Sequence, residues 1–173
     1  MDLERYPSFT SNDYQDYEFY SEGPKGKVKK IVRYEKVNEK PIIYNIAFGD
    51  EDEETGRIND TAVTNNQDRN MVLATVASTI IDFTNHYGNH LIHAEGSTPA
   101  RTRLYQMGIF DIAKQKGDIM PGTLKKGTRE RAYGYATVSD KVKSYADDPY
   151  FVKKAEQAKE TIKKFGLPGA KKK

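Results

Sequence analysis

The period of the hydrophobic pattern changes near residue 65, and this change constrains the fold more than any other feature of the sequence. Before it, apolar residues alternate with polar ones in short stretches, which predicts four β-strands. The predicted strands cover residues 17–21, 27–37, 42–48 and 58–64. The turns between them are short, as in the Glu-Gly-Pro-Lys-Gly segment at 22–26, so we expect antiparallel hairpins.

The part that follows residue 65 has the period of an amphipathic helix. Apolar residues recur every three to four positions from Asp68 to Tyr87, which places them on one face. Asn65 and Asn66 can cap the start of this helix, and Gly88 can end it. We therefore expect one long helix packed against the predicted sheet.

A shorter strand and a second helix complete the predicted core. Residues 91–94 are apolar enough for a fifth strand. Thr98 is a favourable N-cap, and Pro99 is favourable at the first position of a helix. The predicted order is β-β-β-β-α-β-α, which defines an α+β fold. We expect an antiparallel sheet of about five strands with helices packed on one face, plus a basic C-terminal extension that ends in a helix.

This extension divides the chain into three predicted parts. Residues 1–116 form the α+β core domain, residues 117–147 a basic, glycine-rich linker, and residues 148–173 an amphipathic helix with a lysine tail. The apolar positions of the last helix follow a heptad-like seam. They are Phe151, Ala155, Ala158, Ile162 and Phe165. The seam needs a surface to pack on, which is either its own domain or a protein partner that binds residues 149–165.

Charge is divided unevenly along the chain. Residues 1–113 contain 12 Lys and Arg and 18 Asp and Glu, a net charge of −6. Residues 114–173 contain 16 and 7, a net charge of +9. A basic surface of this kind favours polyanions such as nucleic acid. A solvated tail, or an extension folded back on the acidic part, explains the same asymmetry.

The composition argues against several classes of protein. The chain has no cysteine, which rules out a disulfide and a thiolate metal ligand. It has no apolar run long enough for a transmembrane helix, and its first residues lack the basic start and apolar stretch of a secretory signal. We therefore expect a cytoplasmic protein that makes no membrane contact.

Several short motifs resemble one small bacterial family of unknown function. The most specific motif is Gly-Ser-Thr-Pro-Ala-Arg-Thr-Arg-Leu-Tyr at 96–105. Further matching stretches are residues 17–19, 21–26, 44–50 and 63–66. The resemblance covers about residues 3–113, so the basic segment after residue 116 lies outside it. It implies a fold and a bacterial origin, but no activity.

The turn between the fifth strand and the second helix is the strongest candidate for a binding site. A helix N-terminus presents backbone N–H groups and the positive end of the helix dipole, which together favour an anion. Arg101 can add a guanidinium that matches phosphate or carboxylate. The predicted ligand-binding residues are Gly96, Ser97, Thr98, Arg101, Arg103 and Tyr105. In the structural alternative, the arginines of a capped helix pair with Asp82, Glu95 or the acidic loop.

Histidine supplies one weak catalytic candidate. His93 lies on the strand that leads into the predicted anion site, where it can act as a general acid or base in phosphodiester cleavage. A purely structural histidine is the alternative. Neither the spacing of the three histidines nor the acidic run at 50–56 matches a standard metal site. No metal or other cofactor is expected.

A basic segment with tyrosines, residues 125–135, is the second candidate surface. Lysine and arginine can contact phosphates, and tyrosine rings can stack on bases, as nucleic-acid binding requires. The predicted nucleic-acid-binding residues are Lys125, Lys126, Arg129, Arg131, Tyr133 and Tyr135. A solvated loop has the same composition, and no recognised nucleic-acid-binding module is present.

Three classes of function remain open at this point. The first is a polyanion or phosphate-ligand binding protein for nucleic acid or nucleotide, which includes a nuclease-like toxin of a toxin–antitoxin pair. The second is an interaction module that docks through its C-terminal helix. The third is a degenerate N-acetyltransferase-like protein, although residues 65–70 lack the glycine of a pyrophosphate-binding loop. The sequence does not decide whether the protein is an enzyme.

Overall fold

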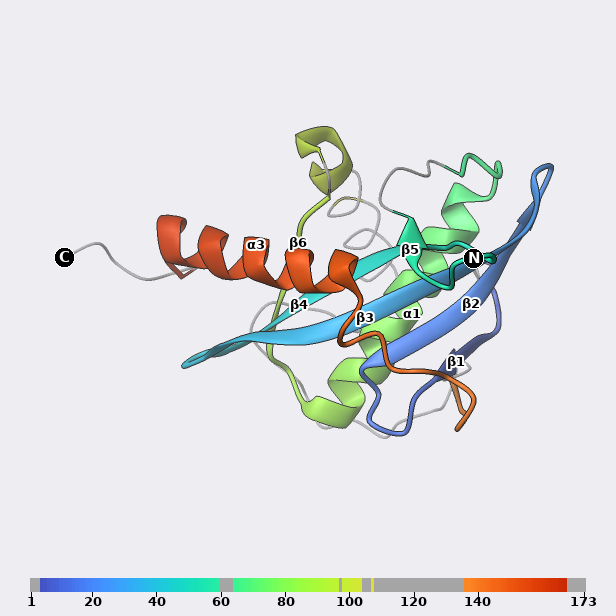
Figure 1. Cartoon of the computed structure of the whole chain (residues 1–173). Coiled ribbons are helices and arrows are strands. Elements are labelled where there is room, and N and C mark those ends of the chain that lie inside the picture. The colour runs from blue at the N-terminus through green and yellow to red at the C-terminus, as the bar shows by residue number, and fades with distance from the viewer. Residues whose placement is uncertain (1–3, 60–63, 97, 104–106, 108–135, 168–173) are drawn as a thin grey trace.

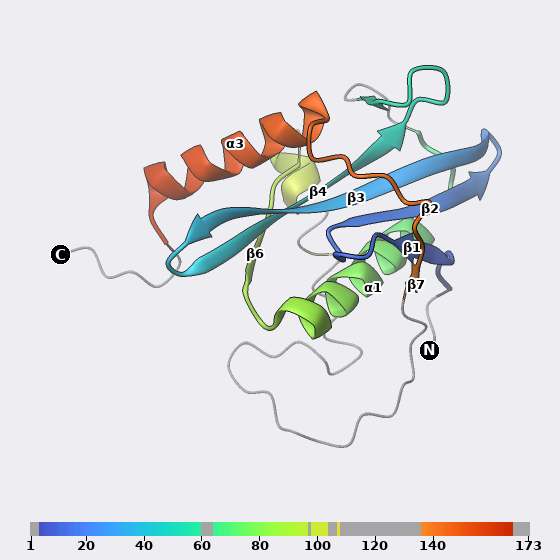
Figure 2. The ribbon, with the colours of Figure 1, turned by 60° about the horizontal axis from the view of Figure 1, so that its bottom comes forward.

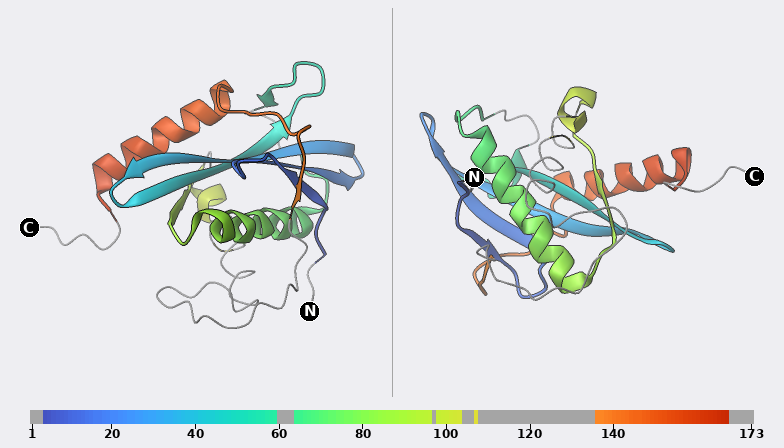
Figure 3. Two further views of the ribbon diagram at one scale, coloured as in Figure 1. Left: turned by 90° about the horizontal axis from the view of Figure 1, so that it is seen from below. Right: turned by 180° about the vertical axis from the view of Figure 1, so that it is seen from behind.

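A twisted β-sheet lies between two long helices, with one helix on each face (Figures 1 and 3). The structure is a computed structural model that describes residues 4–59, 64–96, 98–103, 107 and 136–167. Helix α1 spans Arg69–Tyr87 and helix α3 spans Pro149–Phe165. The strands are β1 (Ser8–Thr10), β2 (Asp16–Gly23), β3 (Gly26–Glu39), β4 (Ile42–Glu51), β5 (Ile58–Asn59), β6 (Leu91–Ala94) and β7 (Thr137–Val138). The predicted α+β fold is confirmed.

The sheet is mixed, whereas the sequence predicted an antiparallel one. Its order is β5-β4-β3-β2-β1-β7, and β6 pairs with β4 beside β5. Strands β2 to β5 are antiparallel neighbours joined in chain order, as the predicted hairpins require, and β1, which the sequence did not predict, is antiparallel to β2. In contrast, β6 runs parallel to β4 and β7 runs parallel to β1. Both strands return to the sheet only after a long connection, and such a connection allows parallel pairing.

Helix α1 covers the first face of the sheet and completes the main hydrophobic core. Strand alternation directs tyrosine, phenylalanine and branched aliphatic side chains of β2, β3 and β4 toward α1. The fully buried members of this core include Tyr17, Phe19, Val32, Tyr34, Val76 and Phe83. Phe83 stacks on Tyr34, with ring centroids 4.0 Å apart. The apolar face that the sequence predicted for this helix therefore packs on the sheet.

The start of α1 differs from the prediction, because neither Asn65 nor Asn66 caps it. Asp68 is the N-cap residue, and its side chain makes no capping hydrogen bond. Asn66 is buried and holds the β2–β3 hairpin instead. Its side chain accepts a hydrogen bond from the Lys25 N–H (2.9 Å) and donates to the Gly26 carbonyl (3.0 Å). Asparagine suits both tasks, because its amide carries a donor and an acceptor.

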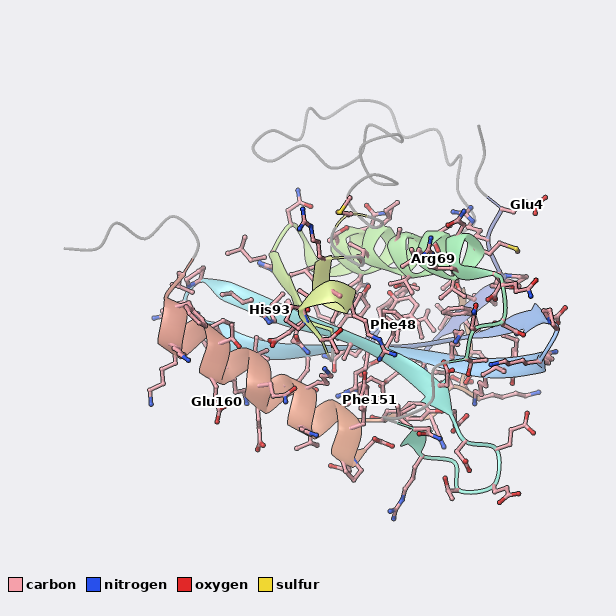
Figure 4. All side chains as sticks on the ribbon, turned by 90° about the horizontal axis from the view of Figure 1, so that it is seen from above. Glu4, Phe48, Arg69, His93, Phe151 and Glu160 are labelled. Carbon is pink, nitrogen blue, oxygen red and sulfur yellow. The ribbon has the colours of Figure 1, made fainter. Side chains whose placement is uncertain are left out.

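Helix α3 covers the second face of the sheet with the predicted seam. Phe151 joins a buried cluster with Ile31, Ala47, Ile58 and Tyr145. Further along, the helix contributes to a second cluster at the β3–β4 hairpin, whose buried members are Val37, Ile43, Ala155 and Ala158. Figure 4 shows Phe151 directed toward the sheet and Glu160 directed away from it. The seam thus packs on its own domain, except at Phe165, which is 73% exposed.

Polar contacts fix the start of α3 to the sheet. Asp148 caps the helix by accepting from the Tyr150 N–H (2.9 Å), and it also accepts from the Ile58 N–H of β5 (3.3 Å). The Tyr150 hydroxyl donates to the Phe48 carbonyl of β4 (2.9 Å). The two bonds to the sheet join residues that are 90 and 102 positions apart in sequence, so only the folded chain brings them together.

An ion cluster holds the segment before α3 against the same face. Glu51 forms salt bridges with Lys29 (2.9 Å) and Lys143 (2.6 Å), and accepts a hydrogen bond from the Tyr145 hydroxyl (2.9 Å). Burial alone would raise the pKa of Glu51, but these three donors hold it below its ordinary value. Nearby, the Tyr145 N–H donates to Asp16, which is paired with Arg33 at 2.6 Å. The carboxylates of Asp16 and Glu51 on this face therefore bind the segment that precedes α3.

We predict that Phe151→Ala destabilises the protein by about 3–5 kcal/mol, as expected for an aromatic side chain removed from a core. The neighbouring Val152 is 41% exposed, so Val152→Ala should change the free energy of unfolding by less than about 0.5 kcal/mol. Chemical denaturation of the full chain measures both changes. Equal effects of the two substitutions would show that α3 does not contribute its seam to the core.

Candidate anion-binding site

The predicted binding turn leaves the sheet where β4 has no strand neighbour on its outer edge. Strand β6 pairs with β4 at Ile43–Ile46, and β5 pairs with it at Asp50 and Glu51. Among the described residues, positions 47–49 of β4 therefore lack a strand partner on this side. The chain leaves β6 after Ala94 and passes through Glu95 and Gly96 into a helical segment at 99–103. Figure 4 shows His93 on the strand that leads into this turn.

The turn itself is compact and closed by its own threonines. The Gly96 N–H donates to the Thr102 hydroxyl (2.9 Å), and that hydroxyl donates to the Thr98 carbonyl (3.1 Å). A Cβ atom at Gly96 would lie 2.7 Å from the Arg101 Cβ, so only glycine allows this close approach. Thr98 caps the helical segment by accepting from the Arg101 N–H (3.2 Å), as the sequence predicted.

These hydrogen bonds change the chemistry expected of the turn. An anion at a helix N-terminus is normally held by free backbone N–H groups. Here the N–H groups of Gly96 and Arg101 already donate to threonine hydroxyls. A phosphate at this turn would therefore depend on guanidinium groups, of which Arg103 is exposed and Arg101 is half-buried. Ser97 and Tyr105, which the sequence also predicted for this site, lie outside the described residues.

His93 is held by a carboxylate that also contacts α3. Its Nε2 atom lies 3.2 Å from Glu95 Oε2, and the Thr161 hydroxyl donates to the same oxygen (3.3 Å). The imidazole is 23% exposed. A histidine fixed by a carboxylate is suited to proton transfer, although the same contact also serves to anchor β6 to α3. The sequence offered no signal for Thr161, because it lies 66 residues from Glu95.

Asp82 is buried in the core and has a hydrogen-bond partner there. It was one of three acidic partners considered for Arg101 and Arg103. Instead it lies in the core, 4% exposed, and accepts a hydrogen bond from the Ala136 N–H. Glu95 contacts His93 and Thr161.

The structure describes none of the residues predicted to contact nucleic acid. All six residues predicted within the segment 125–135 lie outside the described residues. In the described part of the extension, Lys143 pairs with Glu51 of the core. Lys159, Lys163 and Lys164 lie exposed near the C-terminal end of α3, and none of them forms a salt bridge with another described residue. No group of three or more His, Asp or Glu side chains in this part of the chain is placed to hold a metal ion.

Residues 2–120 match the model of a Family of unknown function (DUF6934), so the chain belongs to this family. This match confirms the resemblance seen in the sequence. No curated protein and no solved structure matches the chain. The family region ends before β7 and α3, although α3 covers one face of the sheet. No helix of the described residues has the length and apolarity needed to cross a membrane.

The Thr102 hydroxyl should stabilise the turn measurably. Thr102→Ala removes the acceptor of the Gly96 N–H, so we predict a loss of about 1 kcal/mol in the free energy of unfolding. Thr102→Ser keeps the hydroxyl and should retain most of that free energy. Urea denaturation of both variants measures the difference. If serine and alanine are equally destabilising, the methyl group and not the hydrogen bond supports the turn.

Proposed function

We propose that the protein binds a polyanion, and specifically nucleic acid, through its basic C-terminal part. The observation that carries this proposal is the orientation of α3. The helix packs its apolar seam on the sheet, so its polar face is held outward on a rigid body. The last turns of this face present Lys159, Lys163 and Lys164 to solvent. Lysines held in this way can contact successive phosphates without first ordering the helix.

The charge asymmetry of the chain supports the same proposal. The extension folds back on the acidic part, but it does so mainly through apolar contacts. Within the described residues, the salt bridge Lys143–Glu51 joins a lysine of the extension to a core carboxylate. Lys159, Lys163 and Lys164 form no salt bridge within the described residues, so their positive charge is not neutralised there. Glu156 and Glu160 reduce the charge of α3 itself, which places the basic end at its C-terminus.

The turn after β6 supports a phosphate-binding component of the same function. Arg103 and Thr98 are exposed there, and the Thr98 hydroxyl also caps the helical segment. Glu95 connects this turn to Thr161 on α3, so the turn and the helix lie against one another. A phosphate-bearing ligand that follows α3 toward its N-terminus would pass this turn. We do not invoke catalysis by His93, because binding alone accounts for the basic surface.

The two other classes of function receive less support. A partner that docks on the seam of α3 would have to displace the helix from its own sheet, where Phe151, Ala155 and Ala158 are buried. An N-acetyltransferase relative would hold pyrophosphate near the start of the first helix. At that place Asn66 is buried and its side chain is engaged by the β2–β3 hairpin.

We predict that replacing Lys159, Lys163 and Lys164 together by glutamine weakens binding of a fluorescein-labelled single-stranded oligonucleotide. Fewer counterions are then released on binding. The negative slope of the logarithm of the association constant against log salt concentration should therefore become less steep, by about 2. Fluorescence anisotropy at several salt concentrations measures both quantities. The melting temperature should change little, since all three side chains are exposed.

A matched control carries three glutamines at Lys25, Lys27 and Arg57, which are exposed residues of the family region. This control variant should bind the oligonucleotide nearly as well as the wild-type protein. An equal loss in both variants would indicate non-specific attraction to net charge. Undetectable binding by the wild-type protein at low salt would refute the proposal.

A further inference from the structure

Asp82 is a buried carboxylate at the point where the described chain returns to the core. It lies on α1 next to Phe83, and its side chain is 4% exposed. It accepts a hydrogen bond from the Ala136 N–H at 2.5 Å, and Ala136 is itself buried in the main core. A buried carboxylate is costly unless it is paired with a cation or neutralised by a proton.

Residues 136–142, which we term the return strap, run from Asp82 along the edge of the sheet. Within the strap, β7 pairs in parallel with β1 (Figure 2). The Ser139 N–H donates to the Thr10 carbonyl (2.9 Å), and Asp140 accepts from the Asn12 side chain (2.8 Å). The strap is short and two of its residues form the outermost strand, so few backbone bonds hold it. The hydrogen bond from the Ala136 N–H to Asp82 is therefore needed to hold the first residue of the strap.

Burial favours the neutral form of Asp82. Burial raises the pKa of Asp82 to about 6, although the Ala136 N–H and the positive charge of Arg5 act in the opposite direction. Tyr17 of β2 and Tyr34 of β3 face it across the core, and burial raises the pKa of both tyrosines, so they stay uncharged. When the strap opens, Asp82 meets water and its pKa returns to an ordinary value near 4.

We propose that Asp82 makes the return strap a pH-sensitive latch, closed most firmly when the carboxyl group is protonated and opened more readily when it is ionised. Between about pH 4 and 6 the closed state binds more protons than the open state. The free energy of opening therefore falls as the pH rises through this interval, and it is constant above it. The strap precedes α3 in the chain, so the latch would determine how firmly the C-terminal extension is attached to the core. The proposal does not depend on polyanion binding.

Hydrogen exchange followed by NMR on the full-length protein tests this latch. The protection factor of the Ser139 amide, corrected for the intrinsic exchange rate at each pH, reports opening of the strap. For the wild-type protein we expect this factor to fall roughly 20-fold between about pH 4.5 and 7.5, as a pKa change from about 6 to about 4 requires. In Asp82→Asn, which keeps an acceptor for Ala136 but does not titrate, the factor should stay constant within about twofold.

The comparison with Asp82→Asn separates Asp82 from other groups. The histidines, and Asp16 with its partner Arg33, are unchanged in that variant. The same pH dependence in both proteins, or none in the wild type, would overturn the proposal. The Val32 amide in the centre of the sheet serves as the internal reference. If Asp82→Asn fails to fold, the ¹³C shift of the Asp82 carboxyl group in the wild-type protein decides: a titration near pH 4 would overturn the latch, and one near pH 6 would support it.

Discussion

The central strands β3 and β4 must be covered on both faces, and the rest of the structure follows from this constraint. Tyr34 and Tyr44 point to one side, whereas Ile31 and Ala47 point to the other, and all four are buried. A strand that is apolar on both faces cannot remain stable with one face in water. Helix α1 covers the first face, and the second face needs α3. The C-terminal extension is therefore part of the fold, although the family match ends before it.

Ion pairs on the second face determine where the extension lies. Apolar packing alone is not directional and tolerates sliding of a helix over a sheet. Asp16 and Arg33 are buried there and Glu51 is half-buried, and each forms specific hydrogen bonds to its partners. Tyr145 accordingly has one position, between the carboxylates of Asp16 and Glu51. Such groups contribute less to net stability than to the choice of a single arrangement, because desolvation offsets much of their attraction.

The candidate site and the latch both lie where distant segments of the chain meet. Glu95 joins the turn after β6 to α3, and Asp82 joins α1 to the return strap. Both carboxylates come from the family region, and both partners come from the part of the chain that follows it. The extension is thus attached to the family region at both points.

Local pattern was sufficient for the long elements of this protein, although it did not predict the short strands β1 and β7. Alternation predicted the faces of β4, the period of about 3.6 predicted α1, and the seam of Phe151, Ala155 and Ala158 predicted α3. The Thr98 cap was equally visible, because capping depends on residues three apart. Each of these features is set by neighbours in sequence.

Tertiary structure alone decided which surfaces those elements cover. The parallel pairing of β6 with β4, the role of Asn66 in a hairpin about 40 residues away and the burial of Asp82 depend on contacts between distant segments. The bond from the Gly96 N–H to the Thr102 hydroxyl is another such case, since it forms only in the folded turn. Periodicity predicts that one face of an element is apolar, but it does not predict which element packs against that face. That choice depends on which packing excludes most water while satisfying every buried polar group.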